Sequence, residues 1–116
     1  REAMNMERPL IFICSPYRGD VETNMKNARR YCRFAFEHGG IPFAPHLLFT
    51  QFLDDGSPAE RRAGICLGVE LLKRCDALWA FGQPTDGMAL EIREAAQHGV
   101  PVRRFDSACR EAIENE

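Results

Sequence analysis

Four short apolar runs divide the chain, and segments with the periodicity of amphipathic helices separate them. The runs are Leu10–Cys14, Ile41–Ala44, Asp76–Phe81 and Val100–Phe105. Short continuous runs of this kind are typical of strands covered on both faces, as in a parallel sheet. Prolines cannot donate to a sheet ladder, so Pro42 and Pro45 predict that the second run is an edge strand or a very short one. The charged pair Arg103 and Arg104 suits the last run for the other edge.

Helix signals follow each of these runs. Asp20 is typical of an N-cap before a stripe of apolar residues, and Gly39 ends that stripe. Ser57 and Glu60, with Pro58 after the serine, have the spacing of a capping box. The predicted helices are 21–38, a short one at 47–53, 57–74, 85–98 and a terminal one at 106–116. Residues 1–9 lack apolar periodicity and are predicted to be a flexible leader.

The order of these elements predicts the fold class. Strands that alternate with helices pair in parallel through right-handed crossovers. The chain of 116 residues has the length of one domain, which we place at residues 10–105. We expect an α/β domain with an open parallel sheet in the strand order 2-1-3-4. This is a flavodoxin-like or Rossmann-like sandwich of three layers.

The same strand order predicts where a ligand binds. In open α/β sheets the ligand lies beyond the carboxyl ends of the strands, where neighbouring crossovers leave on opposite faces. The turns Ser15–Gly19 and Gly82–Gly87 follow the first and third strands and are expected to meet there. No G-x-G-x-x-G or Walker loop is present, which argues against the usual dinucleotide or nucleoside triphosphate site.

Glu91 is the first candidate for chemistry, because it follows the second of these turns. We place it in the first turn of its helix, where unpaired N–H groups and the helix dipole stabilise a carboxylate as an anion. The structural alternative is a simple partner of the dipole. The helical neighbours Met88 and Ala95 indicate that Glu91 borders the buried face of the helix.

The other candidates lie in the turns and after the second strand. Arg18 can clamp a phosphate or a carboxylate, and Tyr17 can orient a hydroxyl. Ser15 supplies a hydroxyl or closes its turn, and His46 follows the second strand at the same end of the sheet. Thr85, like its neighbour Asp86, serves equally well as a helix cap or as a ligand contact. Each of these residues also has a purely structural interpretation.

The amino-acid composition argues against some classes of binding partner. The net charge is −2 and the isoelectric point is near 5.9, which argues against a nucleic acid polymer or an anionic membrane as the partner. The five cysteines are an odd number without a C-x-x-C pair, and no secretory signal precedes them. They indicate a reducing cytoplasm and lack the ligand spacing of a zinc site.

Two glycines lie four residues apart in the third predicted helix. Glycine in a helix interior costs about 1 kcal/mol relative to alanine, so Gly64 and Gly68 call for a reason. Close packing on the sheet is one interpretation. The other is the close approach of a second subunit.

Four segments resemble one family. They are Cys14-Ser-Pro-Tyr-Arg-Gly19, Ala44-Pro-His-Leu-Leu-Phe49, Glu70-Leu-Leu-Lys-Arg-Cys-Asp76 and Asp86-Gly-Met-Ala-Leu-Glu-Ile92. They are similar to the small bacterial and phage proteins described as nucleoside 2-deoxyribosyltransferase-like, which are related to deoxynucleoside 5′-monophosphate N-glycosidases. The resemblance covers about residues 10–105.

This resemblance implies roles for the candidate residues. The glutamate four residues after a glycine, here Glu91 after Gly87, is the family's nucleophile on the anomeric carbon of the sugar. Arg18 and His46 resemble the family's arginine and histidine, and Thr85 takes the place of a hydroxyl residue that contacts phosphate. Tyr17 would orient the glutamate. The resemblance implies no metal or cofactor and a homodimer or higher homo-oligomer, in which a neighbour completes each site.

Three positions differ from the family's pattern. Phe12 stands where the family has a tyrosine, and Gly68 stands near its base-facing aspartate. Asp86 lies five residues before the glutamate, where transferases have an aspartate six before. We expect cleavage or transfer at the N-glycosidic bond of a (deoxy)nucleoside or its 5′-monophosphate. The alternative is a nucleotide-binding module without turnover, of a phage or a mobile element.

Overall fold

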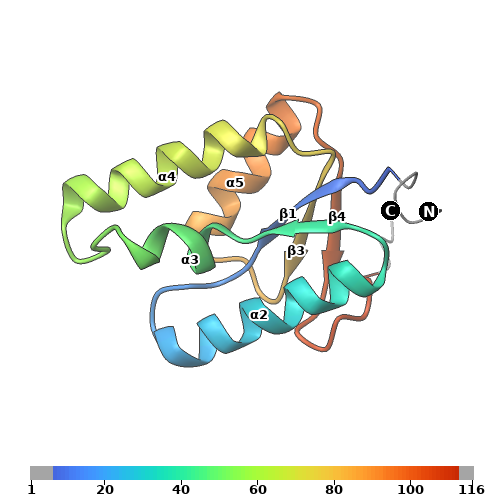
Figure 1. Ribbon diagram of the computed structural model, residues 1–116, viewed down its shortest axis with the longest axis horizontal. Coiled ribbons are helices and arrows are strands. Elements are labelled where there is room, and N and C mark those ends of the chain that lie inside the picture. The colour runs from blue at the N-terminus through green and yellow to red at the C-terminus, as the bar shows by residue number, and fades with distance from the viewer. Residues whose placement is uncertain (1–6, 113–116) are drawn as a thin grey trace.

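The computed structural model describes residues 7–112, and the predicted sheet is present in it. The strands pair in parallel in the order β2-β1-β3-β4, as expected (Figure 1). The elements are β1 (Leu10–Cys14), α2 (Val21–Glu37), β2 (Ile41–Phe43), α3 (Pro45–Leu48), the 3₁₀ helix η1 (Phe49–Gln51), α4 (Pro58–Leu72), β3 (Ala77–Phe81), α5 (Asp86–Gln97) and β4 (Val102–Phe105).

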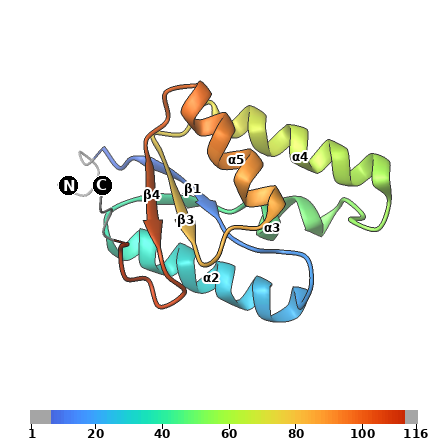
Figure 2. The ribbon, with the colours of Figure 1, turned by 180° about the vertical axis from the view of Figure 1, so that it is seen from behind.

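Three layers arise because the side chains of the central strands alternate between two faces. On β1, Phe12 and Cys14 point into a core shared with α4 and α5. Ile11 and Ile13 point into the other core, which Tyr31 and other residues of α2 complete. Figures 1 and 2 show α4 and α5 on one side of the sheet and α2 on the other. Burial on both faces explains why the central strands are continuous apolar runs.

Local capping fixes the turns at the carboxyl ends of β1 and β3. The Asp20 carboxylate accepts a hydrogen bond from the Thr23 amide at 3.2 Å, which begins α2. Gly82 ends β3 with a φ of +84°, a conformation that residues with a Cβ rarely adopt. Thr85 then caps α5, with its Oγ1 accepting from the Met88 amide at 3.2 Å. The chain therefore reverses tightly and directs the start of α5 across the end of the sheet.

The capping box at the start of α4 is only half formed. Ser57 Oγ accepts from the Glu60 amide at 3.3 Å, as the sequence predicts. The Glu60 carboxylate instead accepts from the Asp54 amide at 2.7 Å and does not return to the Ser57 amide. This contact orders the loop before α4 and with it Asp55.

Helix α4 packs through its C-terminal half, where Gly68 and Leu72 are buried, while its N-terminal half extends beyond the sheet (Figures 1 and 2). A Cβ atom at Gly64 would come 3.6 Å from Leu53 Cδ1, and one at Gly68 would come 3.8 Å from Pro45 Cβ. Both glycines therefore face the α3 region of the same chain. Their packing is internal, although the partner is the segment before α4 instead of the sheet.

The predicted helix at 106–116 is wrong for its described part. Residues 106–112 form a turn followed by an isolated antiparallel bridge between Phe105 and Glu111. Asp106 accepts hydrogen bonds from the amides of Ala108 and Arg110, both at 2.9 Å. Such a side chain competes with helix formation for backbone donors. Residues 113–116 lie outside the described part of the chain.

The predicted leader also falls mostly outside the description, which begins at residue 7. Arg8 donates to the backbone oxygen of Gly40 at 2.8 Å, and its guanidinium lies 4.9 Å from the centre of the Phe36 ring. Within residues 7–112, no helix is both long enough and apolar enough to cross a lipid bilayer.

Candidate active site

A cavity of about 350 Å³ opens at the carboxyl ends of β1 and β3. Its size lies within the range of small-molecule sites, roughly 300–1,000 Å³. All the residues that the sequence nominates line it, namely Ser15, Tyr17, Arg18, His46, Thr85, Asp86, Gly87 and Glu91. The two predicted turns do meet there, because β1 and β3 are neighbours in the sheet.

Glu91 enters this cavity from the second turn of α5, not from the first turn as predicted, because the helix begins at Asp86. The expectation that the helix dipole stabilises the Glu91 carboxylate as an anion is therefore wrong, because Glu91 lies beyond the first turn and burial disfavours its charged form. Glu91 is only partly exposed, and burial raises its pKa to about 7, while a hydrogen bond from the Cys14 side chain works in the opposite direction. Desolvation outweighs the stabilising contacts, so the carboxyl group titrates near neutrality.

Cys14 is the side chain that contacts the Glu91 carboxyl group. Its thiol is fully buried, lies 3.8 Å from the backbone oxygen of Met88 and is close enough to Glu91 for the charge of that group to act on it. Burial, and then the charge of Glu91, raise the pKa of the Cys14 thiol well above its usual value. The group therefore stays protonated and can donate. The sequence interpretation treats Cys14 only as a small apolar residue, because nothing in the local spacing links it to Glu91.

Tyr17 has a different neighbour from the one expected. Its ring stacks on His46, with the ring centres 4.8 Å apart and the planes inclined by 26°. Within residues 7–112 no hydrogen bond joins the Tyr17 hydroxyl to Glu91. Burial, and then the Asp55 carboxylate, raise the pKa of Tyr17. Tyr17 thus contributes an aromatic wall to the cavity, while the contact to Glu91 comes from β1.

His46 lies in the short helix α3 and is held against the turn Ser15–Gly19. Its Nε2 lies 3.1 Å from the backbone oxygen of Ser15. A carbonyl oxygen only accepts, so the imidazole carries a proton on Nε2 in this contact. Burial lowers the pKa of His46. The neutral ring therefore keeps Nδ1 as an acceptor.

Ser15 has an unpaired hydroxyl. The residue is 2% exposed, and its Oγ has no hydrogen-bond partner in the described part of the chain. A buried hydroxyl without a partner is unfavourable, and this one belongs to the cavity wall. A bound ligand with a suitable donor or acceptor would satisfy it.

The start of α5, which overlaps the turn Gly82–Gly87, lines another part of the cavity. Thr85, Asp86 and Gly87 all line the cavity. A Cβ atom at Gly87 would meet only Thr85 Oγ1, at 3.9 Å, so the missing side chain leaves open space toward the cavity. The first amides of a helix favour an anion.

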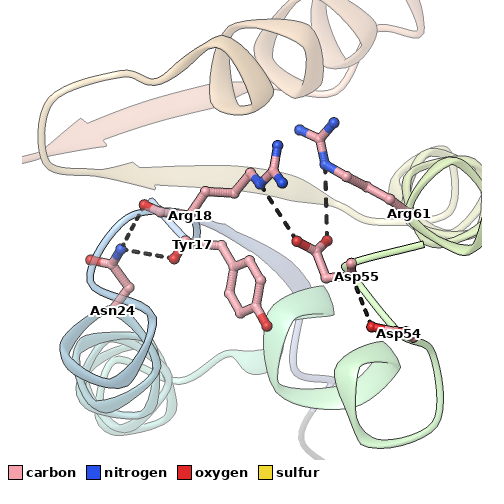
Figure 3. A network of polar contacts seen from close by, with 7 residues as sticks. Tyr17, Arg18, Asn24, Asp54, Asp55 and Arg61 are labelled. Carbon is pink, nitrogen blue, oxygen red and sulfur yellow. Dashed lines mark hydrogen bonds and ion pairs between the residues drawn. The ribbon is translucent and has the colours of Figure 1, made fainter. Parts of the chain in front are cut away.

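Two charged residues that the sequence analysis did not identify, Asp55 and Arg61, also line the cavity and lie near Arg18 (Figure 3). The Asp55 carboxylate lies 3.5 Å from Arg18 Nε and 3.9 Å from Arg61 Nε. Asn24 holds the loop of Arg18 by donating to the backbone oxygens of Tyr17 and Arg18, at 2.9 and 3.2 Å. The run Asp54–Gly56 predicts no more than a loop, so only the packed chain identifies Asp55 and Arg61 as cavity residues.

No group of three or more histidine, cysteine, aspartate or glutamate side chains within residues 7–112 is arranged to hold a metal ion. The cavity combines one carboxyl group that titrates near neutrality, an unpaired hydroxyl, an aromatic wall and a rim of arginines. A cavity of this size with a few polar groups is typical of small-molecule sites.

The comparisons with known proteins agree with this architecture. The model of a family described as a domain of unknown function (DUF7768) matches residues 9–105. The chain belongs to this family. No curated protein matches it.

A solved structure of similar fold is a 2-deoxyribosyltransferase from the psychrotolerant bacterium Bacillus psychrosaccharolyticus, a biocatalyst for nucleoside synthesis. The two chains superpose with a TM-score of 0.63 and 23% identity, over 90% of this chain and 76% of the other. A likeness at this identity shows that this DUF7768 chain shares the fold.

Proposed function

We propose that this DUF7768 protein cleaves, or transfers across, the N-glycosidic bond of a (deoxy)nucleoside or its 5′-monophosphate, with Glu91 as the nucleophile. One observation carries the proposal. A glutamate with a pKa of about 7 lines a cavity of about 350 Å³ at the switch point of the sheet. A carboxyl group with a perturbed pKa in a cleft at the switch point of an α/β fold marks a candidate active site. The similarity in fold to a 2-deoxyribosyltransferase is consistent with this chemistry.

The reaction would proceed by covalent catalysis in two displacements. The ionised Glu91 carboxylate attacks C1′ of the sugar, the bond from C1′ to the base nitrogen breaks, and its electron pair leaves with the base, which takes up a proton. Water then attacks C1′ for hydrolysis, or a second base for transfer. That step breaks the ester bond between C1′ and Glu91 and restores the carboxylate.

The other cavity residues would bind and orient the substrate. Arg18, Thr85 and the first amides of α5 suit a 5′-phosphate, by charge and by hydrogen bonding. The buried Ser15 hydroxyl, which has no partner in the described part of the chain, would pair with the ligand. The stacked rings of Tyr17 and His46 offer a flat apolar surface to a sugar or a base.

One observation favours a second candidate, a nucleotide-binding module without turnover. Gly68 stands near the position at which the resembling enzymes have an aspartate that faces the base, and glycine has no acidic side chain. Its missing side chain would point toward Pro45. A protein that lacks this acid could keep the pocket and lose the reaction.

Incubation of the pure protein with a panel of deoxynucleosides and their monophosphates separates the two candidates. Free base detected by chromatography, and absent with Glu91→Gln, would support the enzyme. Saturable binding in calorimetry without release of base would support the binding module. Neither binding nor turnover with any member of the panel would contradict both candidates.

We also propose that the protein works in the cytoplasm as at least a homodimer. This assembly follows from the resemblance alone, because Gly64 and Gly68 pack inside the chain and offer no separate support. Light scattering that gives the mass of a monomer at micromolar concentration would contradict it.

A further inference from the structure

Cys14 is held rigidly beneath Glu91. It is the last residue of the central strand β1, pairs in register with Ala80 of β3 and is 0% exposed. Its Sγ lies 3.8 Å from the backbone oxygen of Met88. Met88 and Glu91 are three residues apart and therefore share one face of α5. The sheet thus presents a thiol to the very turn of the helix that carries the carboxyl group.

From this geometry we propose that Cys14 is a positioning residue: its thiol donates a hydrogen bond to one oxygen of the ionised Glu91 and leaves the second oxygen for the ligand. The catalytic meaning of this contact rests on the proposed function of Glu91. The hydrogen bond between Cys14 and Glu91 can exist whether or not Glu91 is catalytic.

The thiol has one proton and two acceptors within reach, the Met88 carbonyl and the Glu91 carboxyl group. An ionised carboxylate is the stronger acceptor. Because burial keeps Cys14 protonated, the thiol turns to Glu91 once that group ionises. A thiol is a weak donor, so it orients the carboxylate while lowering its pKa only slightly. The carboxylate therefore remains basic enough to be a good nucleophile.

Other charges act on this pair and must stay constant in any test. The charged and titratable groups that line the cavity with Glu91 are Tyr17, Arg18, His46, Asp55, Glu60, Arg61 and, on its own helix, Asp86. From β4, Arg104 favours the ionised form of the Cys14 thiol. Substitutions at Cys14 alter none of them.

The test is a titration of Glu91 by carbon-13 NMR of its side-chain carboxyl in the full-length protein, without any ligand. Cys14→Ala removes the donor and should raise the pKa of Glu91 by on the order of half a unit. Cys14→Ser restores a donor and should bring the pKa back to the wild-type value or below it. The matched control is Cys75→Ala, another buried cysteine of the same core, whose thiol donates to the backbone oxygen of Leu71 at 3.4 Å. It should leave the titration of Glu91 unchanged.

An unchanged pKa in Cys14→Ala, or an equal shift in Cys75→Ala, would overturn the proposal. The infrared S–H stretching band of the wild-type protein supplies a second measurement, which needs no variant of Cys14. Part of this band should move to lower frequency as Glu91 ionises, and it should not move in Glu91→Gln. A band that is independent of pH in the wild type would also contradict the hydrogen bond.

Where the wild type releases base, the acid limb of its kcat/KM profile should move to higher pH in Cys14→Ala by the shift that NMR records. Cys14→Ser should reverse the movement. A wild type without activity would contradict the proposed function, whereas the NMR titration would still decide whether Cys14 donates to Glu91.

Discussion

The charged side chains on two walls of the cavity differ in how far they are buried from water. The α5 wall consists of Thr85–Met88 and Glu91, and it rests on the two central strands, where Cys14 of β1 lies behind it. The α4 wall consists of Asp55, Glu60, Arg61, Gly64 and Ile65. On the first wall Met88 is 2% exposed, Cys14 behind it is 0% exposed, and burial raises the pKa of Glu91 to about 7. On the second wall Asp55 and Arg61 form an ion pair, and both side chains are partly exposed to water.

The difference follows from desolvation. A carboxyl group surrounded by apolar atoms loses its hydration, so its charge becomes costly and its pKa rises. The side chain of Arg61 is 41% exposed. The side chain of Arg18, which reaches Asp55 from the turn Ser15–Gly19, is 61% exposed. Exposed pairs of this kind contribute little to stability. The α5 wall therefore holds the carboxyl group whose pKa is raised, whereas the α4 wall holds charges that remain partly hydrated.

The largest expected effect comes from removing the reactive group of the α5 wall. Glu91→Gln keeps the shape of the side chain and removes the attacking oxygen, so kcat should fall by about 10³-fold or more. Glu94→Gln is the matched control, because it makes the same change on the same helix away from the cavity lining. The measurement is release of free base, with circular dichroism to verify the fold. Equal losses in both variants would contradict a special role for Glu91.

A smaller effect is expected at the rim. Arg18→Ala removes a charged donor and should raise KM for a nucleoside monophosphate by about 10- to 100-fold. The free nucleoside should be affected little. Arg33→Ala removes an arginine that pairs with Glu37 on α2 and serves as the control. An equal effect of Arg18→Ala on nucleoside and monophosphate would show that Arg18 does not bind the phosphate.

Stability should depend on pH through Glu91. The group titrates near 4.5 in an unfolded chain and near 7 in the native protein, so between these values the native state binds more protons. The free energy of unfolding that Glu91 contributes is fully present below pH 4.5 and is lost as pH rises through 7. The stability of the wild type relative to Glu91→Gln should therefore fall by about 1–3 kcal/mol over that interval. Urea denaturation at several pH values measures it, and parallel curves for the two proteins would argue against a raised pKa.

The smallest effect concerns the ion pairs of the α4 wall. Asp55→Asn removes the carboxylate between Arg18 and Arg61, yet the free energy of unfolding should change by less than about 1 kcal/mol, because these pairs are exposed. Thermal or urea denaturation checks this value. A loss of several kcal/mol would mean that the α4 wall supports the fold, and the contrast between the two walls would then disappear.

Much of the fold could be predicted because its signals are local. The continuous apolar runs indicate buried parallel strands, and the caps Asp20 and Thr85 lie within three residues of the amides that they bind. Alternation of strand and helix then limits the topology, so the convergence of the two turns followed from the order of the elements. The terminal segment after Phe105 was the exception, since Asp106 satisfies the same local rules in a turn as in a helix cap.

The sequence by itself identified Glu91, His46 and the residues of the two turns as candidates for the cavity, and the tertiary structure added Asp55 and Arg61 and decided what these side chains contact. The thiol of Cys14 reaches the turn of Met88 and Glu91 over 74 residues of chain, and Arg18 meets Asp55 and Arg61 from another element. No spacing rule relates such positions, because their contact depends on how the sheet and helices pack. The protonation of Glu91 has the same origin. A helix dipole acts within one turn and can be predicted from sequence, whereas desolvation depends on every group that packs around the carboxyl.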